Sequence, residues 1–442
     1  MKKQWFVILL LLVSAGLLAA QSSDILIKIT GGQQAVIAVT DMRGSGEAQA
    51  WMETFNKVLY DELAAAGTLK IAAKSTYPLA LPQRPQDFRP GGPQLSDWSR
   101  PPVSANYLAF GYTAVQDGRL VLFGYLYDTS QPVAGAQVLG KLYFGELTAE
   151  GARAVAQEFA ADILARFGLR SLAGSKIYFV RELERGVKEI WVMDYDGSNQ
   201  RQLTHYGGIA FMPAVSKDNT KLAFTLLSQR NPAIRIHSIA TNRVLPFVNP
   251  QASVNSSPDF APDGETIVFS SSLGGGYANL FAAKIDGSDL RPLTRVRAVE
   301  TEPKINPKTG NEIVFTSGRS GAPQIYRMSA MGADIERLTT GEGEAVNPSW
   351  HPDGEVIAFA WTRGYELGNF NIFVMDVAQK KFVQLTHGAG RNENPTWAPD
   401  GRHLAFSSNR SGTPQIYTML ADGTQVRQLT SQGRNTMPVW SK

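Results

Sequence analysis

The chain of 442 residues contains no cysteine. This absence excludes disulfide bonds, catalysis by a thiolate, and zinc or iron–sulfur sites with cysteine ligands. Only 5 histidines are present, and the formal net charge is +4. A charge this small gives no sign of the clustered basic surface that nucleic-acid binding requires, so we expect no nucleic-acid partner.

Long hydrophobic runs are absent after residue 20, whereas the first 20 residues contain one. This segment starts with basic residues, continues as an apolar run from Trp5 to about Leu18, and ends on two alanines. The pattern predicts a secretory signal peptide over residues 1–20, cleaved near Ala20. An uncleaved anchor helix is the less favoured alternative, because the run is short. We therefore expect a chain that is exported out of the cytoplasm and does not insert into the membrane.

The second half of the chain contains an internal repeat. A closing phrase such as "RQLT" ends each unit, and Thr204 and Thr430, its first and last threonines, lie 226 residues apart. Five intervals span this distance, so the period is about 45 residues, which is typical of four-stranded propeller blades. Counting the degenerate copy "RVLP", six phrases are present. The repeat therefore predicts an all-β, six-bladed β-propeller over residues 171–442, with WD40-like units.

The two ends of this repeat complement each other. The first unit contains only three expected strands, whereas the chain ends on "MPVWSK", which matches the opening strand of the other units. Closing a ring of sheets requires the first and last blades to be joined, and closure leaves only short edges. We expect the C-terminal strand to complete the first blade.

Antiparallel alternation places the loops of the propeller at two ends. Short Asp-Gly turns gather at one end, and long, varied loops gather at the other, where function usually concentrates. Each long loop leads to a proline that opens an innermost strand. We expect the residues before these prolines to line the channel mouth: Met212, Ser257, Glu302, Asn347, Asn394 and Met437.

Residues 21–170 lack the repeat and combine strand and helix patterns, which predicts a mixed α/β domain. Strands are expected at "DILIKIT" and "AVIAVTDM", a hairpin turns near Asp117-Gly118, and a proline-rich loop runs from Pro78 to Pro102. Two apolar periodicities predict helices, one containing Phe55 and Leu59 and one containing Phe159 and Ile163. We expect both helices to pack on one sheet.

The sequence contains no recognisable catalytic constellation. It lacks a G-x-S-x-G elbow, an H-E-x-x-H pair and a phosphate-binding glycine loop. We expect no metal and no cofactor, and structural or solvated roles for the histidines. Arginine and tryptophan each recur at a fixed offset within the repeat, and we expect both groups to have scaffold roles. The arginines are Arg319, Arg363 and Arg410, and the tryptophans are Trp350, Trp397 and Trp440. A propeller hydrolase or lyase acting on a peptide or polysaccharide in the channel remains the alternative, although only Glu302 supplies a carboxylate there.

The whole arrangement resembles the TolB family, periplasmic propeller proteins of the Tol–Pal system. An exported α/β domain precedes repeats of the form "P-x-W-x-P-D-G…AF-x-S…IY-x-M…DG…LT", and the chain ends on "PVWSK". The resemblance implies a non-enzymatic adaptor that binds a Pal-like peptidoglycan-associated lipoprotein on the propeller loop face. It also implies contact with a TolA-like inner-membrane protein, and a role in envelope integrity, constriction at cell division and protein import.

The resemblance also implies particular residues. Thr301 matches a family position that contacts Pal, Ser257 occupies an equivalent one, and Val254 stands where the family carries a histidine. The segment that contacts the TolA-like protein corresponds to residues 21–32. Its expected signalling residues are Gln21, Asp24, Ile25, Ile27 and Ile29. We expect the protein to be a monomer.

Overall fold

A computed structural model describes residues 35–228 and 231–441 of the chain. Their contacts separate two compact units, one of residues 35–173 and one of residues 174–441. The expected signal peptide, the expected strand "DILIKIT" and the five N-terminal signalling residues lie outside the described residues. Within the described ranges, no helix is long and apolar enough to cross a membrane.

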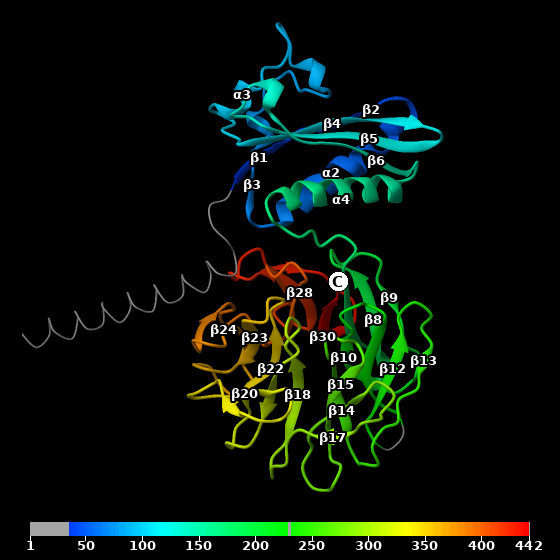
Figure 1. The fold of residues 1–442 in the computed structure, drawn as a ribbon, viewed down its shortest axis with the longest axis vertical. Helices are drawn as coiled ribbons and strands as arrows, with labels where there is room; N and C mark the ends of the chain where they lie inside the picture. The colour runs from blue at the N-terminus through cyan, green and yellow to red at the C-terminus, as the bar shows by residue number, and fades with distance from the viewer. Residues whose placement is uncertain (1–34, 229–230, 442) are drawn as a thin grey trace, which may run out of the picture. The chain divides into compact units, whose positions relative to one another are not determined.

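The first unit contains one six-stranded sheet in the order β3-β1-β4-β5-β6, with β2 paired to β4. Its strands are β1 (Ala35–Val39), β2 (Arg43–Gly44), β3 (Leu69–Ile71), β4 (Tyr107–Gln116), β5 (Arg119–Asp128) and β6 (Gln137–Glu146). The helices α2 (Met52–Ala65) and α4 (Ala149–Arg166) cover one face, as Figure 1 shows. Phe55, Leu59, Phe159 and Ile163 are fully buried beneath them. The expected packing of two helices on one sheet is confirmed.

Part of the opposite face is covered by the proline-rich loop. The loop contains two short helical turns, η3 (Pro85–Asp87) and α3 (Ser96–Ser99). Elsewhere the unit has three more: η1 (Gly46–Trp51), η2 (Lys74–Thr76) and η4 (Val133–Gly135). Trp98 of α3 is fully buried against Phe110 and its neighbours in a second hydrophobic cluster. The sequence predicted a loop here, but it did not predict that the loop packs on the sheet to form a second, smaller core of this unit.

The second unit is a propeller built from antiparallel sheets. Four sheets have four strands each: β14 (Asn255–Phe260) to β17 (Arg291–Pro292), β18 (Glu300–Ile305) to β21 (Glu336–Arg337), β22 (Ala345–Trp350) to β25 (Lys381–Gln384), and β26 (Asn392–Trp397) to β29 (Arg427–Gln428). Their middle strands are β15 (Thr266–Ser271), β16 (Asn279–Lys284), β19 (Glu312–Ser317), β20 (Gln324–Ser329), β23 (Val356–Trp361), β24 (Asn371–Asp376), β27 (His403–Ser408) and β28 (Gln415–Leu420). Trp350, Trp397 and Trp440 are all buried, which confirms their expected place in the core.

The remaining strands form one eight-stranded sheet in the order β13-β12-β11-β10-β8-β7-β30, with β9 paired to β8. They are β7 (Lys176–Glu182), β8 (Lys188–Asp194), β9 (Arg201–Gln202), β10 (Ile209–Val215), β11 (Lys221–Leu227), β12 (Ala233–Ser238), β13 (Val244–Leu245) and β30 (Arg434–Ser441), with η5 (Glu184–Gly186) between β7 and β8. Only one residue pair, Ile209 with Lys188, joins the β7–β9 half to the β10–β13 half. Strand β30 pairs antiparallel with β7, which lies between β30 and β8, and Figure 1 shows the red β30 in the same part of the propeller as the green β8.

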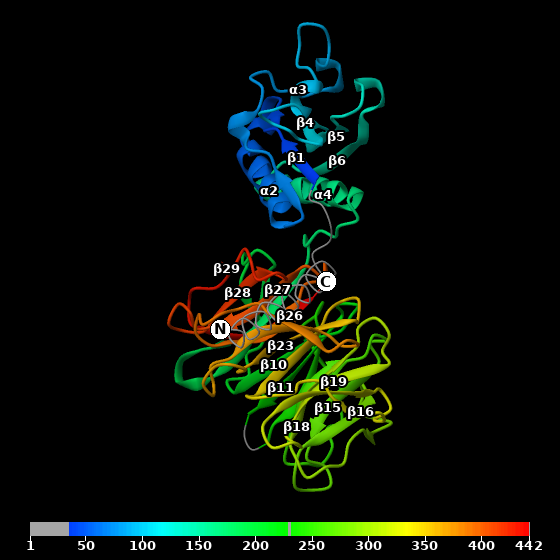
Figure 2. The ribbon, with the colours of Figure 1, turned by 90° about the vertical axis from the view of Figure 1, so that its left-hand side faces the viewer.

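The innermost strands contact one another in the cyclic order β10, β14, β18, β22, β26, β30 and back to β10. Figure 2 shows several of these strands, including β10, β18 and β26, from a second side. Segments far apart in the sequence therefore lie side by side around the inside of the propeller.

The repeated "LT" phrase braces each sheet. The Thr204 hydroxyl accepts a hydrogen bond from the Ile190 backbone N–H (2.8 Å), and Thr294, Thr339, Thr386 and Thr430 accept equivalent bonds at 2.9–3.0 Å. Where Pro246 replaces threonine, the Asn249 side chain accepts the corresponding N–H of Ile234 at 2.8 Å. A buried backbone donor needs a partner, so this requirement explains the recurrence of the phrase.

Candidate binding surface on the propeller

The residues before the six strand-opening prolines share an unusual backbone conformation. All six have positive φ angles between +51° and +55°. Each lies where the pairing of the first and second strands shifts register, as in a β-bulge. A bulge leaves a residue out of the ladder and re-aims its side chain. The six residues are Met212, Ser257, Glu302, Asn347, Asn394 and Met437.

This conformation is costly for such residues. A residue before proline normally stays extended, and a left-handed backbone costs a non-glycine residue on the order of 1–3 kcal/mol. The sequence predicts these residues just ahead of the strands, but the structure places them inside, as Ser257 within β14 shows. Pairing resumes on the loop side of the bulge, where Asn255 and Ser256 oppose Ser271 and Ser270.

Three of the predicted site residues meet at one arc of the inner ring. The Ser257 hydroxyl lies 2.9 Å from the Met212 sulfur and 2.9 Å from the Thr301 hydroxyl. The Ser257 backbone N–H donates to the Thr225 hydroxyl at 3.0 Å. Ser257 is 4% exposed, so it links neighbouring strands from a buried position.

Three more predicted residues continue this arc. The Glu302 carboxylate accepts hydrogen bonds from the Asn347 backbone N–H (2.8 Å), the Asn347 side chain (2.6 Å) and the Thr316 hydroxyl (2.9 Å). The Asn347 side-chain oxygen in turn accepts the Asn394 N–H at 3.2 Å. Both oxygens of Glu302 are thus engaged in bonds between strands, which suits a structural role better than general-base chemistry.

An ion pair follows the bulges, two residues further along the inner strands. Lys304 lies 3.0 Å from Asp259, which also accepts the Ile305 backbone N–H at 2.9 Å. Burial raises the pKa of Asp259 above its ordinary value, while Lys304 and this N–H oppose the rise. This pair is not among the residues predicted from the sequence, although both members occupy one repeat offset, directly after Pro258 and Pro303.

Val254 lies apart from this ring, in the loop that precedes β14. Its backbone exchanges hydrogen bonds with Ser272, whose hydroxyl accepts the Val254 N–H and whose N–H donates to the Val254 carbonyl, both at 3.0 Å. Ser272 begins the loop that contains Leu273 and Tyr277, which are 36% and 51% exposed.

The next long loop adjoins the same surface. The Glu300 N–H donates to the Ala278 carbonyl at 2.9 Å, so Val299, 52% exposed, lies beside the Tyr277 loop. We call this surface the loop-end patch and define it as Val254, Leu273, Tyr277 and Val299. Leu273 and Tyr277 lie in the segment "SSLGGGYANL" and Val299 lies in the next long loop, and no motif in the sequence singles out these three residues.

Met437, the remaining predicted residue, packs against the hydrophobic cluster that contains Tyr178 and Phe224. The five N-terminal signalling residues lie outside the described part of the chain. The structure therefore brings together Met212, Ser257 and Thr301, and likewise Glu302, Asn347 and Asn394, but not Val254.

The recurrent arginines act as braces, as expected. Arg319 donates from Nε to the buried Glu300 carboxylate at 3.1 Å, and Arg410 donates to the Asn392 side chain at 3.0 Å. Arg363 lies over the rings of Trp361 and Phe382, with its guanidinium carbon 5.0 and 4.8 Å from their centroids. Recurrence at one repeat offset therefore marks scaffold here.

Most histidines that the structure describes also have structural partners. His237 is buried against the Tyr206 hydroxyl (2.8 Å), His351 contacts the Gly401 carbonyl (2.7 Å), and His403 contacts Asp400 (2.7 Å). No group of three or more His, Asp or Glu side chains suited to a metal ion occurs among residues 35–228 and 231–441.

Comparison with known proteins identifies the family of the chain. The family described as TolB beta propeller domain matches residues 167–367 and 341–442. A protein named "Protein TolB homolog" from Chlorobium luteolum is 31% identical over 418 residues, which cover 93% of this chain and 90% of that protein. The chain belongs to the TolB family. This membership places it among the proteins of the Tol–Pal system.

Other TolB proteins extend the comparison. A TolB homologue from Chlorobium chlorochromatii is 33% identical over 262 residues, covering 59% of this chain and 47% of that protein. The crystal structure of TolB from Acinetobacter baumannii matches with a TM-score of 0.75 and 19% identity, covering 93% of this chain and 97% of that one. At this identity, the match shows a shared fold.

Proposed function

We propose that this TolB family member is a non-enzymatic periplasmic adaptor that binds a Pal-like lipoprotein through the loop-end patch. The observation that carries the proposal is the patch itself, whose Leu273, Tyr277 and Val299 side chains are exposed. Val254 and Val299 stand shortly before Ser257 and Thr301 in the chain, and these two positions match partner-contacting positions of the family. Exposed apolar side chains gathered on rigid loops are typical of protein interfaces.

The proposal includes the rest of the pathway that the family implies. The N-terminal segment, residues 21–32, contacts a TolA-like protein, and the two contacts support envelope integrity, constriction at division and protein import. The mature chain starts near Gln21 and acts as a monomer. The engagement of Glu302 by Asn347 and Thr316 supports an adaptor over a hydrolase or lyase.

We further propose that the propeller has six blades and closes through β30. The cyclic contacts of the innermost strands and the pairing of β30 with β7 support this architecture. In this reading, the eight-stranded sheet consists of two blades joined by the single pair of Ile209 with Lys188. Closure would hold the long loops of all blades in a fixed arrangement at one end.

The test uses the mature chain and the soluble domain of a Pal-like lipoprotein from the same organism, with affinity measured by isothermal titration calorimetry. Tyr277→Ser and Val299→Ser should each weaken binding about tenfold, which corresponds to about 1.4 kcal/mol. Met331→Ser is the matched control, since Met331 is 72% exposed but lies in a turn between β20 and β21, at the other end of the blades. Absence of binding at about 100 μM of the lipoprotein domain would refute the proposal. Equal losses of affinity in all three variants would also refute it.

A further inference from the structure

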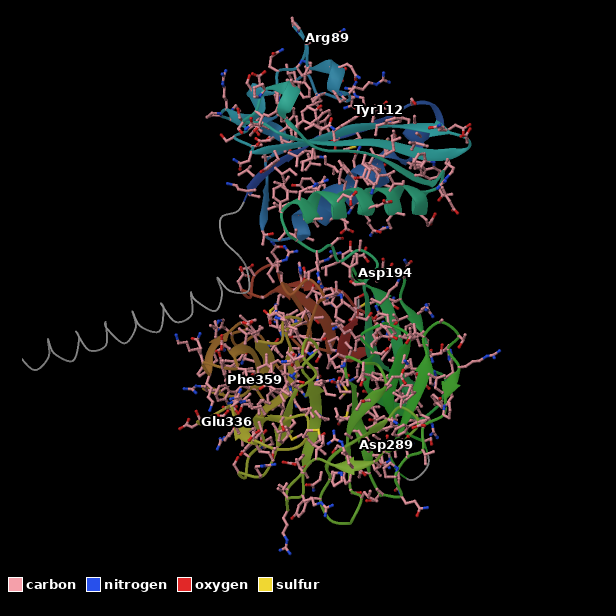
Figure 3. The ribbon with its side chains drawn as sticks, viewed as in Figure 1. Arg89, Tyr112, Asp194, Asp289, Glu336 and Phe359 are labelled. Carbon is pink, nitrogen blue, oxygen red and sulfur yellow. The ribbon has the colours of Figure 1, made fainter. Side chains whose placement is uncertain are left out.

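The two ends of the proline-rich loop meet around a pocket that the proposed function does not use. Residues 76–79, around the start of the loop, and residues 97 and 100–103, around its end, line a cavity of about 420 Å³. Figure 3 labels Arg89, which lies near the middle of the loop and extends away from the sheet. Ligand pockets in proteins enclose about 300–1,000 Å³, so this cavity can hold a small ligand. We call it the Tyr77 pocket.

Both ends of the loop are held in place where they line the Tyr77 pocket. The Tyr77 hydroxyl donates to the Ala72 carbonyl at 3.0 Å, and the Tyr77 ring packs edge-on against buried Trp98, with centroids 5.1 Å apart. At the end of the loop, the Ser104 N–H donates to the Arg100 carbonyl at 3.0 Å. The chain itself therefore maintains the shape of the pocket, and a ligand does not have to order it.

Most side chains that line the Tyr77 pocket are apolar. They include Leu79, Pro78, Pro101, Pro102 and Val103. Leu79 is fully exposed. An exposed leucine beside an apolar cavity is surface that a bound apolar group would remove from water, which is favourable. The pocket therefore favours a ligand with apolar side chains.

Two opposite charges also line the Tyr77 pocket. Asp97 lies in α3, and Arg100 directly follows this helix. Both residues are exposed, and among the described residues neither side chain has a hydrogen-bond or ion-pair partner. The Thr76 hydroxyl, in contrast, already donates to the Ala73 carbonyl at 2.7 Å. A ligand that carries one charge of each sign can therefore pair with Asp97 and Arg100 at once.

The spacing of the two charges fits the ends of a very short peptide. Side chains three residues apart on a helical turn have Cβ atoms about 5–6 Å apart. The ammonium and carboxylate groups of an extended dipeptide lie about 7 Å apart, a distance that two flexible side chains can match. An ion pair between two exposed side chains contributes little stability, so a ligand that engages Asp97 and Arg100 separately does not displace a strong contact.

We infer that the Tyr77 pocket binds zwitterionic peptides of about dipeptide size that carry apolar side chains. The ammonium group of the ligand meets the Asp97 carboxylate, and its carboxylate meets the Arg100 guanidinium. Its side chains lie against the prolines, Val103 and Leu79. This inference goes beyond the proposed function and is independent of binding at the loop-end patch.

The test titrates the full mature chain with the dipeptide Leu-Leu and follows binding by saturation-transfer difference NMR. Three analogues each lack one property: N-acetyl-Leu-Leu lacks the ammonium group, Leu-Leu amide lacks the carboxylate, and Ser-Ser lacks the apolar side chains. Leu-Leu should bind about fivefold more tightly than each analogue, which corresponds to about 1 kcal/mol. No binding of Leu-Leu at about 10 mM, or equal affinities of Ser-Ser and Leu-Leu, would overturn the inference.

Two variants match each charged group of the ligand to one side chain. Asp97→Asn should lower the affinity for Leu-Leu about fivefold but leave that for N-acetyl-Leu-Leu unchanged, because this analogue has no ammonium group. Arg100→Gln should likewise lower the affinity for Leu-Leu and leave that for Leu-Leu amide unchanged. In either variant, equal losses for Leu-Leu and for the matching analogue would overturn the inference.

A third variant tests the apolar contact. Leu79→Ser should weaken binding of Leu-Leu about fivefold. Leu367→Ser is the matched control, because Leu367 is 77% exposed on the propeller. All these variants change exposed side chains, so each should keep the wild-type melting profile. Unchanged affinity in Leu79→Ser, or an equal loss in Leu367→Ser, would overturn the inference.

Two other occupants are decided by the same titrations. N-acetyl-Leu-Leu amide has no charged end and represents a segment within a partner protein. If it bound as tightly as Leu-Leu, the pocket would be assigned to such a segment. A peptide of residues 21–34 that binds more tightly than Leu-Leu and displaces it would assign the pocket to the chain's own N-terminal segment. Either result would overturn the inference, whereas weaker binding of both peptides supports it.

Discussion

The pairing of β30 with β7 makes a quantitative prediction about the chain's last residues. Deleting residues 437–442 removes the register pairs that Val439, Trp440 and Ser441 form with β7. Trp440 is only 7% exposed, and its indole N–H donates to the Ser175 hydroxyl at 3.0 Å. Truncating a buried tryptophan to alanine costs about 3–5 kcal/mol, and each lost hydrogen bond adds about 1 kcal/mol.

The total loss exceeds about 5 kcal/mol, which is comparable with the whole stability of many domains. The deletion should therefore leave the propeller unfolded or open at about 25 °C. Trp440→Ala should instead lower the free energy of unfolding of the propeller by about 3–5 kcal/mol. Hydrogen exchange with mass spectrometry resolves the two units. Amides of β7 and β8 should lose protection in the deletion variant, while those of α2 and β4 keep it.

Trp350→Ala is the control, because Trp350 is 6% exposed and lies at the same repeat position, away from the chain ends. It should cost a similar free energy but leave the β7 amides protected under native conditions. A deletion variant with wild-type protection at β7 and an unchanged denaturation midpoint would refute the role of β30 in closure.

Three further substitutions test other parts of the account. Asn347→Asp places a second carboxylate against Glu302 and should cost about 2–3 kcal/mol at neutral pH in urea denaturation, with partial recovery at acid pH. Arg319→Met leaves the fully buried Glu300 carboxylate without its ion-pair partner. It should lower the free energy of unfolding by about 3–5 kcal/mol in the same measurement. Burial raises the pKa of Tyr77 from 10.0 to about 12, so its stabilising contribution is complete below pH 10 and lost as pH rises toward 12. Between pH 10 and pH 12 the free energy of unfolding should therefore fall in the wild type by up to about 3 kcal/mol more than it falls in Tyr77→Phe.

Each of these predictions has an outcome that contradicts it. Equal stability of Asn347→Asp and Asn347→Ala at neutral pH would contradict the predicted repulsion between the introduced carboxylate and Glu302. Arg363→Met is the control for Arg319→Met, since the Arg363 guanidinium donates to the Thr340 carbonyl at an exposed site and not to a buried carboxylate among the described residues. Equal losses of stability in the two variants would contradict the buried-charge argument. Identical alkaline unfolding of wild type and Tyr77→Phe would contradict the assigned role of the Tyr77 phenol.

The repeat made the strands of the propeller predictable from the sequence. A period of about 45 residues, Asp-Gly turns and a recurring tryptophan each correspond to one local requirement of a blade. The Asp263 carboxylate, for example, accepts the N–H groups of Glu265 and Thr266 at 2.8 and 2.9 Å within its turn. Requirements that recur at one offset can be read from a single sequence.

The site was less predictable, because it depends on contacts between repeats. The sequence selected Ser257 and Glu302 by position, but it gave no sign that a left-handed bulge would hold them inside the strands. The ion pair of Asp259 with Lys304 joins two repeats, and although both residues follow a strand-opening proline, neither repeat alone shows that the two side chains meet. Likewise, nothing in the composition of the proline-rich loop reveals that its two ends meet around the Tyr77 pocket.

The central claim is that a Pal-like lipoprotein binds the loop-end patch, and a hydrogen-exchange footprint of the complex tests it most directly. The mature chain would be compared with and without a saturating amount of the soluble Pal-like domain. We predict protection in three segments, residues 252–257, 272–278 and 296–302, with no change in the turn at residues 330–335. Protection of that turn without protection of the three segments, or no protection at saturation, would contradict the account.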